Sequence, residues 1–205
     1  PPLRSPEQRR GGPDTTPRRS SPPLRSPEQR RGDPGRSLLE VTDLTVEFGR
    51  RRTRAVDAVS FALEPGERLG IIGESGSGKT VTALAVMGLL PENAHVSGSI
   101  RWRGTELLGR PERELARLRG NAMSMVFQEP MTALDPTMRV GRQVAEAFVL
   151  HRGDASGSAR ERTIEMLDAV GLADAGRVAD AFPHQLSGGQ RQRVILAMAL
   201  INGPD

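Results

Sequence analysis

The chain has 205 residues, with 29 Lys+Arg, 25 Asp+Glu, three histidines and no cysteine. The absence of cysteine excludes a disulfide and a thiolate metal site within these residues. No apolar run approaches the roughly 20 residues that a membrane-spanning helix needs. The length allows one large domain, or one domain and a tail.

Residues 1–36 differ in composition from the remainder. The 11-residue segment that begins at Pro1 recurs identically from Pro22, and residues 1–36 hold nine arginines and four acids. A segment so rich in Pro, Arg and Ser cannot bury a core, so we expect a disordered tail. The tail would be either inert or a basic arm for an anionic surface, and its composition favours the inert reading.

The ordered domain is expected over residues 37–205 and begins with strands. Residues 38–41, 44–48 and 55–63 have the apolar pattern of strands, and Pro65-Gly66 forms a turn after them. Residues 67–72 then read as a short buried strand, and residues 79–90 as an apolar helix that Pro91 stops.

Between this strand and this helix lies a glycine-rich loop of the pattern GxxxxGK[ST], which binds phosphate groups. Its glycines allow backbone N–H groups to turn toward one anion, and the helix adds the positive end of its dipole. Lys79 is the only lysine of the chain, and the Thr80 hydroxyl is placed to ligate Mg²⁺. The predicted nucleotide-binding loop consists of Gly73, Glu74, Ser75, Gly76, Ser77, Gly78, Lys79 and Thr80.

Strands and helices are expected to alternate in the next part of the chain. Residues 96–103 and 122–127 have the apolar pattern of strands, and residues 105–118 that of a helix. From 129 to 185 the apolar spacing is helical, with a capping box at Ser158 and Glu161 and a helix end at Gly171. We therefore predict an α/β core with an inserted α-helical subdomain over residues 129–185.

A second motif, Leu186-Ser187-Gly188-Gly189-Gln190, precedes an expected buried helix over residues 191–201. Ser187 and Gln190 can form a capping box, which would be a purely structural role. Capping does not explain Gly188 and Gly189, because each glycine in a first helical turn costs about 1 kcal/mol relative to alanine. Two bare glycines are useful where another molecule approaches the backbone, and a helix N-terminus favours an anion.

A phosphate loop followed by Leu-Ser-Gly-Gly-Gln resembles the ATP-binding-cassette (ABC) ATPases, over residues 38–205. The resemblance implies a P-loop NTPase fold of ABC type, with ATP and Mg²⁺ as ligands. Phe127-Gln128-Glu129-Pro130 is similar to the family's Q-loop, which implies that Gln128 contacts Mg²⁺ and the attacking water. Phe48 lies where the family places an aromatic ring that stacks on adenine, although a place in the strand core would explain it equally well.

The finer resemblance is to ATPase subunits of dipeptide, oligopeptide and nickel importers. It rests on residues 55–61, 73–79, 129–136 and 183–193. It implies a peripheral subunit on the cytoplasmic face of the cell membrane, which docks on transmembrane permease subunits and pairs head to tail with a second ABC domain. That domain would be a second copy, a related chain or the other half of a tandem protein. A substrate-binding protein would deliver the peptide, and no nucleic acid is expected.

In this family the chain continues past the equivalent of Asp205 into a strand with the Walker B aspartate, followed by the catalytic glutamate. Because neither acid is found in the sequence as given, we expect the 205-residue chain itself not to hydrolyse ATP and to expose apolar surface. Two alternatives to an importer subunit are an ABC ATPase of translation or DNA repair and a non-catalytic nucleotide-binding module. The repair type would show zinc-binding cysteines, which the sequence lacks.

Overall fold

The computed structural model describes residues 37–127, 133–152 and 158–205. The predicted tail and Gln128 therefore lie outside the described residues. Within the described part, a four-stranded antiparallel sheet has the order β2-β1-β3-β4. Its strands are β1 (Leu39–Phe48), β2 (Thr53–Leu63), β3 (Ala94–Trp102) and β4 (Thr105–Glu106).

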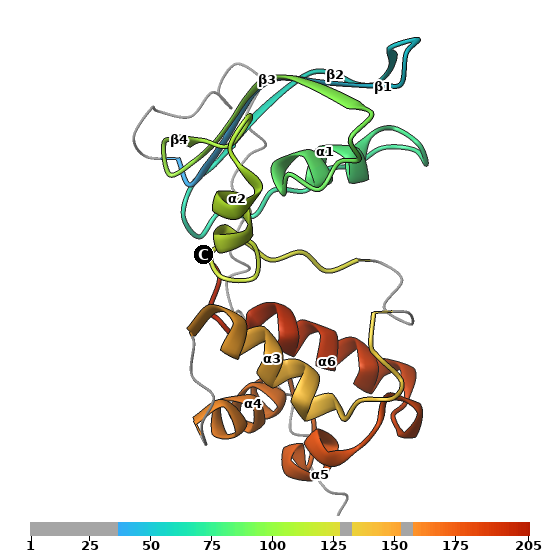
Figure 1. Cartoon of the computed structure of the whole chain (residues 1–205), viewed down its shortest axis with the longest axis vertical. Coiled ribbons are helices and arrows are strands. Elements are labelled where there is room, and N and C mark those ends of the chain that lie inside the picture. Colours follow the sequence, from blue (N-terminus) through green and yellow to red (C-terminus); the bar gives the residue numbers. More distant parts are fainter. Residues whose placement is uncertain (1–36, 128–132, 153–157) are drawn as a thin grey trace, which may run out of the picture.

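One face of this sheet forms an apolar core. Val41, Leu44 and Val46 of β1 are almost completely buried, together with Ile100 of β3. Two helices complete this body, α1 (Lys79–Val86) and α2 (Glu112–Leu118), and α1 lies against β1 and β2 (Figure 1). The apolar residues of β1 therefore face the helices, as expected for a sheet that is covered on one side, and an irregularity between Val41 and Leu44 shifts the alternation by one residue.

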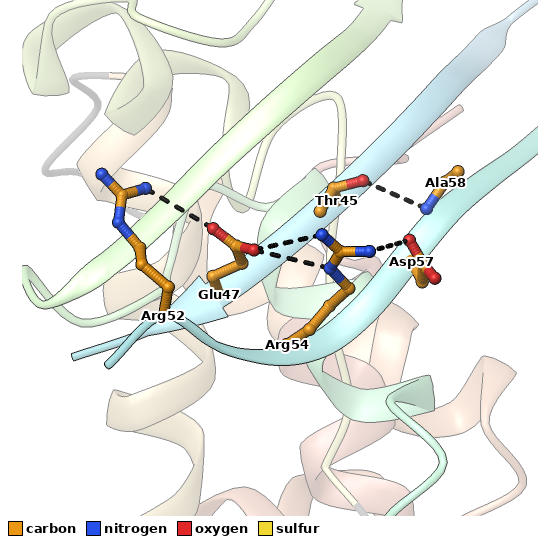
Figure 2. Close-up of polar contacts among 6 residues, drawn as sticks. All are labelled: Thr45, Glu47, Arg52, Arg54, Asp57 and Ala58. Atoms are coloured by element: carbon orange, nitrogen blue, oxygen red, sulfur yellow. Dashed lines mark hydrogen bonds and ion pairs between the residues drawn. The ribbon is translucent and has the colours of Figure 1, made fainter. Parts of the chain in front are cut away.

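The opposite face of β1 and β2 is polar (Figure 2). Arg54 donates to Asp57 at 2.9 Å and forms an ion pair with Glu47 at 3.4 Å, and Arg52 approaches Glu47 at 3.6 Å. Thr45 Oγ1 accepts the backbone N–H of Ala58 at 3.1 Å, at a place where the pairing of β1 with β2 is irregular. The ion pairs are exposed and stabilise the fold little, about 0–1 kcal/mol each, whereas the hydroxyl replaces a missing ladder bond.

A second body consists of helices: α3 (Val140–Arg152), α4 (Ser158–Ala169), α5 (Ala175–Asp180), a short 3₁₀ turn η3 (Pro183–Gln185) and α6 (Gly188–Leu200). A separate apolar cluster holds them together, with Val140, Val144, Leu167 and Val194 at its buried centre. Figure 1 shows the two bodies one above the other, with α1 in the sheet body and α6 in the helical body. No helix of the described residues is long and apolar enough to cross a membrane.

Two predicted strands are absent from the structure. Residues 67–72 and 124–127 have no regular secondary structure, and Met123 forms only an isolated bridge to Arg119. A strand needs a hydrogen-bonded neighbour, and the described sheet has none beside either segment. Several of their apolar side chains are accordingly exposed to solvent: Ile72 is 98% exposed, Ile71 49% and Phe127 52%.

Three helix predictions need a correction of their bounds. The helix predicted over residues 79–90 ends at Val86, because Gly88 takes a positive φ of 62° and ends it before Pro91 is reached. Residues 105–106 form β4, so only the second half of the helix predicted over 105–118 exists. The last helix begins at Gly188, three residues before the predicted start. The predicted helix end at Gly171 is confirmed by its φ of 79°.

The carboxylate of Glu106 closes the β3–β4 turn. It accepts the Ser99 hydroxyl and the backbone N–H groups of Ile100 and Leu108. Burial alone would raise the pKa of Glu106, but the hydrogen bonds from Ser99 and from the backbone of Ile100, Leu108 and Leu107 outweigh it, so the pKa is lowered. The charged form is therefore the one that stabilises the turn.

We expect Glu106→Gln to lower the free energy of unfolding at neutral pH by about 1 kcal/mol, because a charge-assisted acceptor is lost. A carboxyl whose pKa is depressed on folding stabilises the protein above its unfolded pKa, and this contribution disappears as the pH falls through the folded value. The difference between E106Q and the parent should therefore begin to shrink below the ordinary glutamate pKa of about 4.3 and be lost once the pH has fallen through the lowered folded value. Urea denaturation at a series of pH values measures this, and Glu92→Gln, an exposed change, is the control. A difference that stays constant down to low pH would contradict the assignment.

Candidate functional site

The loop from Gly73 to Thr80 connects an irregular segment after β2 to the first turn of α1. It is held against β2 at Gly78, which has a φ of 87° and precedes the first helical residue. A Cβ at Gly78 would lie 2.5 Å from the carbonyl oxygen of Ala55 and 3.2 Å from Cγ2 of Val56. Both the conformation and the space therefore require glycine at this position.

The ammonium group of Lys79 lies inside the curve of the loop. Nζ donates to the carbonyl oxygens of Gly73 at 2.9 Å and Glu74 at 2.6 Å, and to Ser77 Oγ at 3.1 Å. These three contacts fold the loop around a single positive charge. An anion that entered the loop would meet this charge first, and phosphate oxygens can replace the carbonyl oxygens as acceptors.

The backbone N–H groups of the loop are available to a ligand. In the described part of the chain, no protein acceptor is bonded to the N–H of Gly76, Gly78, Lys79 or Thr80. The N-terminus of α1 also lacks a side-chain cap, and no acidic residue lies in its first turn. A helix start that leaves its donors unpaired and its dipole uncompensated favours a multiply charged anion.

The Thr80 hydroxyl is exposed and forms no side-chain hydrogen bond within the described residues. It is therefore free to act as an oxygen ligand, which suits Mg²⁺. Among the residues that the structure describes, no group of three or more His, Cys, Asp or Glu side chains could hold a metal ion. A Mg²⁺ ion at this loop would therefore need oxygen ligands from the bound anion as well.

The second motif begins α6. The predicted capping box is confirmed: Gln190 Oε1 accepts the Ser187 N–H at 2.9 Å, and Ser187 Oγ accepts the Gln190 N–H at 3.3 Å. Ser187, Gly188 and Gly189 are exposed. A Cβ at Gly188 or Gly189 would meet nothing within 4 Å, and neither residue has a positive φ. The fold of this chain therefore does not require glycine at either position.

The structure does not bring the two motifs together within one chain. The phosphate loop opens the helix of the sheet body, whereas Ser187–Gln190 opens the helix of the helical body (Figure 1). Each motif is at a helix N-terminus, and the two helices belong to different bodies. A ligand that touched both motifs would have to lie between two molecules.

Two further predicted residues have a less direct outcome. Phe48, at the end of β1, is half-buried, pairs in register with Thr53 and Ala94, and packs on the core of the sheet body. Its stacking on adenine stays a prediction, as does the role of Gln128, which lies outside the described residues. Nothing local in the sequence marks Ala55 and Val56 as the support of the loop, because their contact with Gly78 joins positions more than 20 residues apart.

Comparisons with known proteins agree with this geometry. A family model described as "ABC transporter" matches residues 56–205. The chain is 51% identical over 174 residues to the oligopeptide transport ATP-binding protein OppD of Mycobacterium tuberculosis, covering 82% of this chain and 28% of the relative. It is 50% identical over 169 residues to OppD of Salmonella typhimurium, covering 82% of this chain and 50% of the relative. The chain thus spans half or less of the length of these relatives.

Solved structures show the same fold. The ATP-binding cassette MJ0796, in a dimeric structure of a post-hydrolysis state bound to ADP and Pi, aligns with a TM-score of 0.69 and 29% identity. The alignment covers 82% of this chain and 71% of that chain. The predicted ABC-type nucleotide-binding fold is therefore confirmed.

The support of the loop can be tested at Gly78. Gly78→Ala should destabilise the protein by at least about 1–2 kcal/mol, the cost of a left-handed conformation at a non-glycine residue, and the clash with the Ala55 carbonyl adds to it. Gly76→Ala is the matched control, since Gly76 also has a positive φ, of 81°, but a Cβ there meets nothing within 4 Å. Chemical denaturation of both variants measures the difference. Equal destabilisation of the two would mean that the contact with Ala55 has no energetic weight.

Proposed function

Because the chain belongs to the ABC transporter family of ATP-binding domains, we propose that it is the ATP-binding subunit of an importer, which energises the uptake of peptides by binding and hydrolysing ATP. The proposal of peptides rests on the names of relatives that are about 50% identical and are described as oligopeptide transport proteins. The observation that carries ATP binding is the phosphate loop, with one lysine and a set of unpaired N–H groups at the start of α1.

In the proposed mechanism, the β- and γ-phosphates of ATP lie in the loop. Lys79 exchanges the carbonyl oxygens of Gly73 and Glu74 for phosphate oxygens. The unpaired N–H groups of Gly76, Gly78, Lys79 and Thr80 donate to the same anion. Bound Mg²⁺ would neutralise phosphate charge, and Thr80 would be its ligand from this loop. The residues present fit such an ion because they supply one free hydroxyl and leave the remaining coordination to phosphate and water.

The signature motif, defined here as Ser187, Gly188, Gly189 and Gln190, would act on the ATP of a second domain. Its two glycines let the γ-phosphate approach the backbone. The N–H groups of Gly188 and Gly189 and the hydroxyl proton of Ser187 can donate to phosphate oxygens. Two domains paired head to tail would therefore close two ATP sites at once. That second domain is a second copy, a related subunit or the other half of a tandem chain.

We further propose that Phe48 stacks on the adenine ring, and that Gln128 contacts Mg²⁺ and the attacking water. Transmembrane permease subunits would dock on the helical body, and a substrate-binding protein outside the membrane would deliver the cargo. The subunit would then lie at the cytoplasmic face of the membrane, as a peripheral protein. These assignments rest on the family resemblance of the residues concerned.

Replacing Lys79 with Ala tests the nucleotide site. The variant should bind ATP roughly 10- to 150-fold more weakly, since a charge-assisted contact to phosphate contributes about 1.5–3 kcal/mol. Isothermal calorimetry on the full-length protein measures the affinity, and Arg68→Ala, which removes an exposed cation just before the loop, is the control. Equal affinities of K79A and the parent would refute ATP binding at this loop.

For the signature motif we predict that a substitution which stabilises the fold impairs function. Gly189→Ala should raise the free energy of unfolding by as much as about 1 kcal/mol, because alanine is the better helix former and has room. It should also weaken ATP-driven pairing of two domains, since the methyl group lies where the phosphate approaches. Gly176→Ala in α5 is the matched control, because Gly176 is likewise helical with nothing within 4 Å of a Cβ. Urea denaturation and ATP-dependent sedimentation measure the two effects. If G189A and G176A pair equally well, the motif does not face a nucleotide.

A further inference from the structure

The helices that begin at the two motifs end close to one another. The C-terminal end of α1 (Met87 and Gly88) and the C-terminal end of α6 (Asn202) are both bonded to the dipeptide Arg119-Gly120, which follows α2. A few polar contacts therefore connect the sheet body with the helical body. We refer to Met87, Gly88, Arg119, Gly120, Ala147 and Asn202 as the polar junction.

Asn202 forms the half of the junction that reaches the helical body. It is only 7% exposed, and its Nδ2 donates to the carbonyl oxygens of Gly120 at 2.7 Å and Ala147, in α3, at 2.9 Å. Gly120 has a φ of 73°, and a Cβ there would lie 2.9 Å from Nε2 of His151 in α3. One amide thus fixes the end of α6 to both bodies at once.

Arg119 forms the other half. Its side chain is only 17% exposed, and it donates to the carbonyl oxygens of Met87 and Gly88, each at 2.7 Å. The planar guanidinium also holds Glu112 of α2, so its direction is fixed. These are the carbonyls that the end of α1 leaves without helical partners. Arg119 and Gly120 therefore transmit the position of α1 directly to Asn202.

Beyond the end of α6, Asp205 also contacts the sheet body, through its N–H to the Ala122 carbonyl at 3.1 Å and an ion pair with Arg103. The apolar part of the contact between the bodies is loosely packed. A cavity of about 300 Å³ lies beside the junction, lined by residues of both bodies that include Met87, Met125, Ile195 and Met198. Apolar contacts around a cavity do not prescribe an angle, whereas hydrogen bonds are directional. The polar contacts are therefore the ones that can define how the bodies are oriented, and the polar junction supplies the buried ones, at the ends of α1 and α6.

An asparagine at position 202 carries a cost beside its two hydrogen bonds. Its Oδ1 is buried and has no hydrogen-bond partner within the described residues, which is unfavourable. An apolar side chain of similar volume would avoid this penalty, but it would remove the donor from the carbonyl oxygens of Gly120 and Ala147. What such a side chain lacks is the pair of directed N–H groups.

We propose that the polar junction is a positioning device: Asn202 and Arg119 set the orientation of α6 relative to α1, and thereby aim the signature motif. The inference rests on the proposed function in one respect, since the motif is taken to meet the ATP of a second domain. Neither residue touches the nucleotide in this proposal. Both act through the helices whose ends they bind.

The first experiment measures orientation directly. Because the chain has no cysteine, spin labels can be placed at E92C in the sheet body and R177C in the helical body, both at exposed positions. Double electron–electron resonance on the full-length protein should give one narrow distance distribution. Asn202→Leu should broaden or shift it, because the two directed hydrogen bonds of the amide are lost. Asn121→Leu, beside the junction but without a side-chain bond to it, should change nothing.

The second experiment measures the consequence. In N202L, the ATP concentration for half-maximal pairing should rise roughly tenfold, as expected for the loss of two hydrogen bonds, while ATP affinity at Lys79 stays within about twofold. Arg119→Lys keeps the charge but loses the planar guanidinium with its several donors, so it should also raise the ATP concentration for half-maximal pairing. Arg117→Lys, on the exposed side of α2, is its control. If N202L does not fold, R119K decides alone.

An unchanged distance distribution in N202L and R119K would overturn the junction, whatever the nucleotide data show. A broadened distribution with unchanged pairing would overturn its role in aiming the motif. If the parent protein neither binds ATP nor pairs, the proposed function fails, and the distance measurement still decides whether the junction orients the two bodies.

Discussion

The phosphate loop depends on one close contact, the approach of Gly78 to the backbone of β2 at Ala55. This contact fixes where α1 begins. It therefore also fixes where the donors of the first helical turn point and how far Lys79 must reach to close the loop. A side chain at Gly78 would push the helix from the sheet and move the site with it. The Ala55 carbonyl is itself held by the sheet, because its neighbours Arg54 and Val56 in β2 pair with β1.

The two helices that begin at the motifs differ in how their N-termini are capped, and the difference fits what each would bind. Helix α6 has a capping box, so its first turn is rigid without a ligand. Helix α1 has no cap, and the lysine ammonium instead occupies the neighbouring loop. An uncapped start leaves several donors for one polyvalent anion. A capped start with two glycines presents a preformed surface to an anion that is held elsewhere. This difference suits the proposed function, in which the first site holds a nucleotide and the second meets the nucleotide of another domain.

The candidate site was predictable from sequence because its determinants are local. The capping box needs only Ser187 and Gln190, three residues apart, and the contacts of Lys79 all lie within the loop, whereas the support of Gly78 by Ala55 is not local. Residues 67–72 were misjudged for the opposite reason. Their apolar composition is that of a buried strand, but a strand also needs a neighbour, and pairing is a property of distant segments. Residues 105–106 likewise became a strand through pairing with Arg101 and Trp102, which overrode a helical pattern. The polar junction left no signal at all, because an arginine and an asparagine 83 positions apart look like ordinary surface residues until their acceptors are known.

Polar contacts between the two bodies can also fix their relative orientation, which an apolar contact would not do. The helical body has its own buried core, and so does the sheet body. Fusing them through a large apolar interface would be more stable, but it would tolerate several angles of similar energy, because dispersion and burial are not directional. Two carbonyls held by Arg119 and two held by Asn202 permit few angles, at the expense of one unpaired oxygen. A motif that must meet a phosphate held by another molecule has to be positioned to within about 0.5 Å. For such a motif, precise positioning matters more than a small gain in the free energy of unfolding. The unfavourable burial of Asn202 is then the consequence of that requirement.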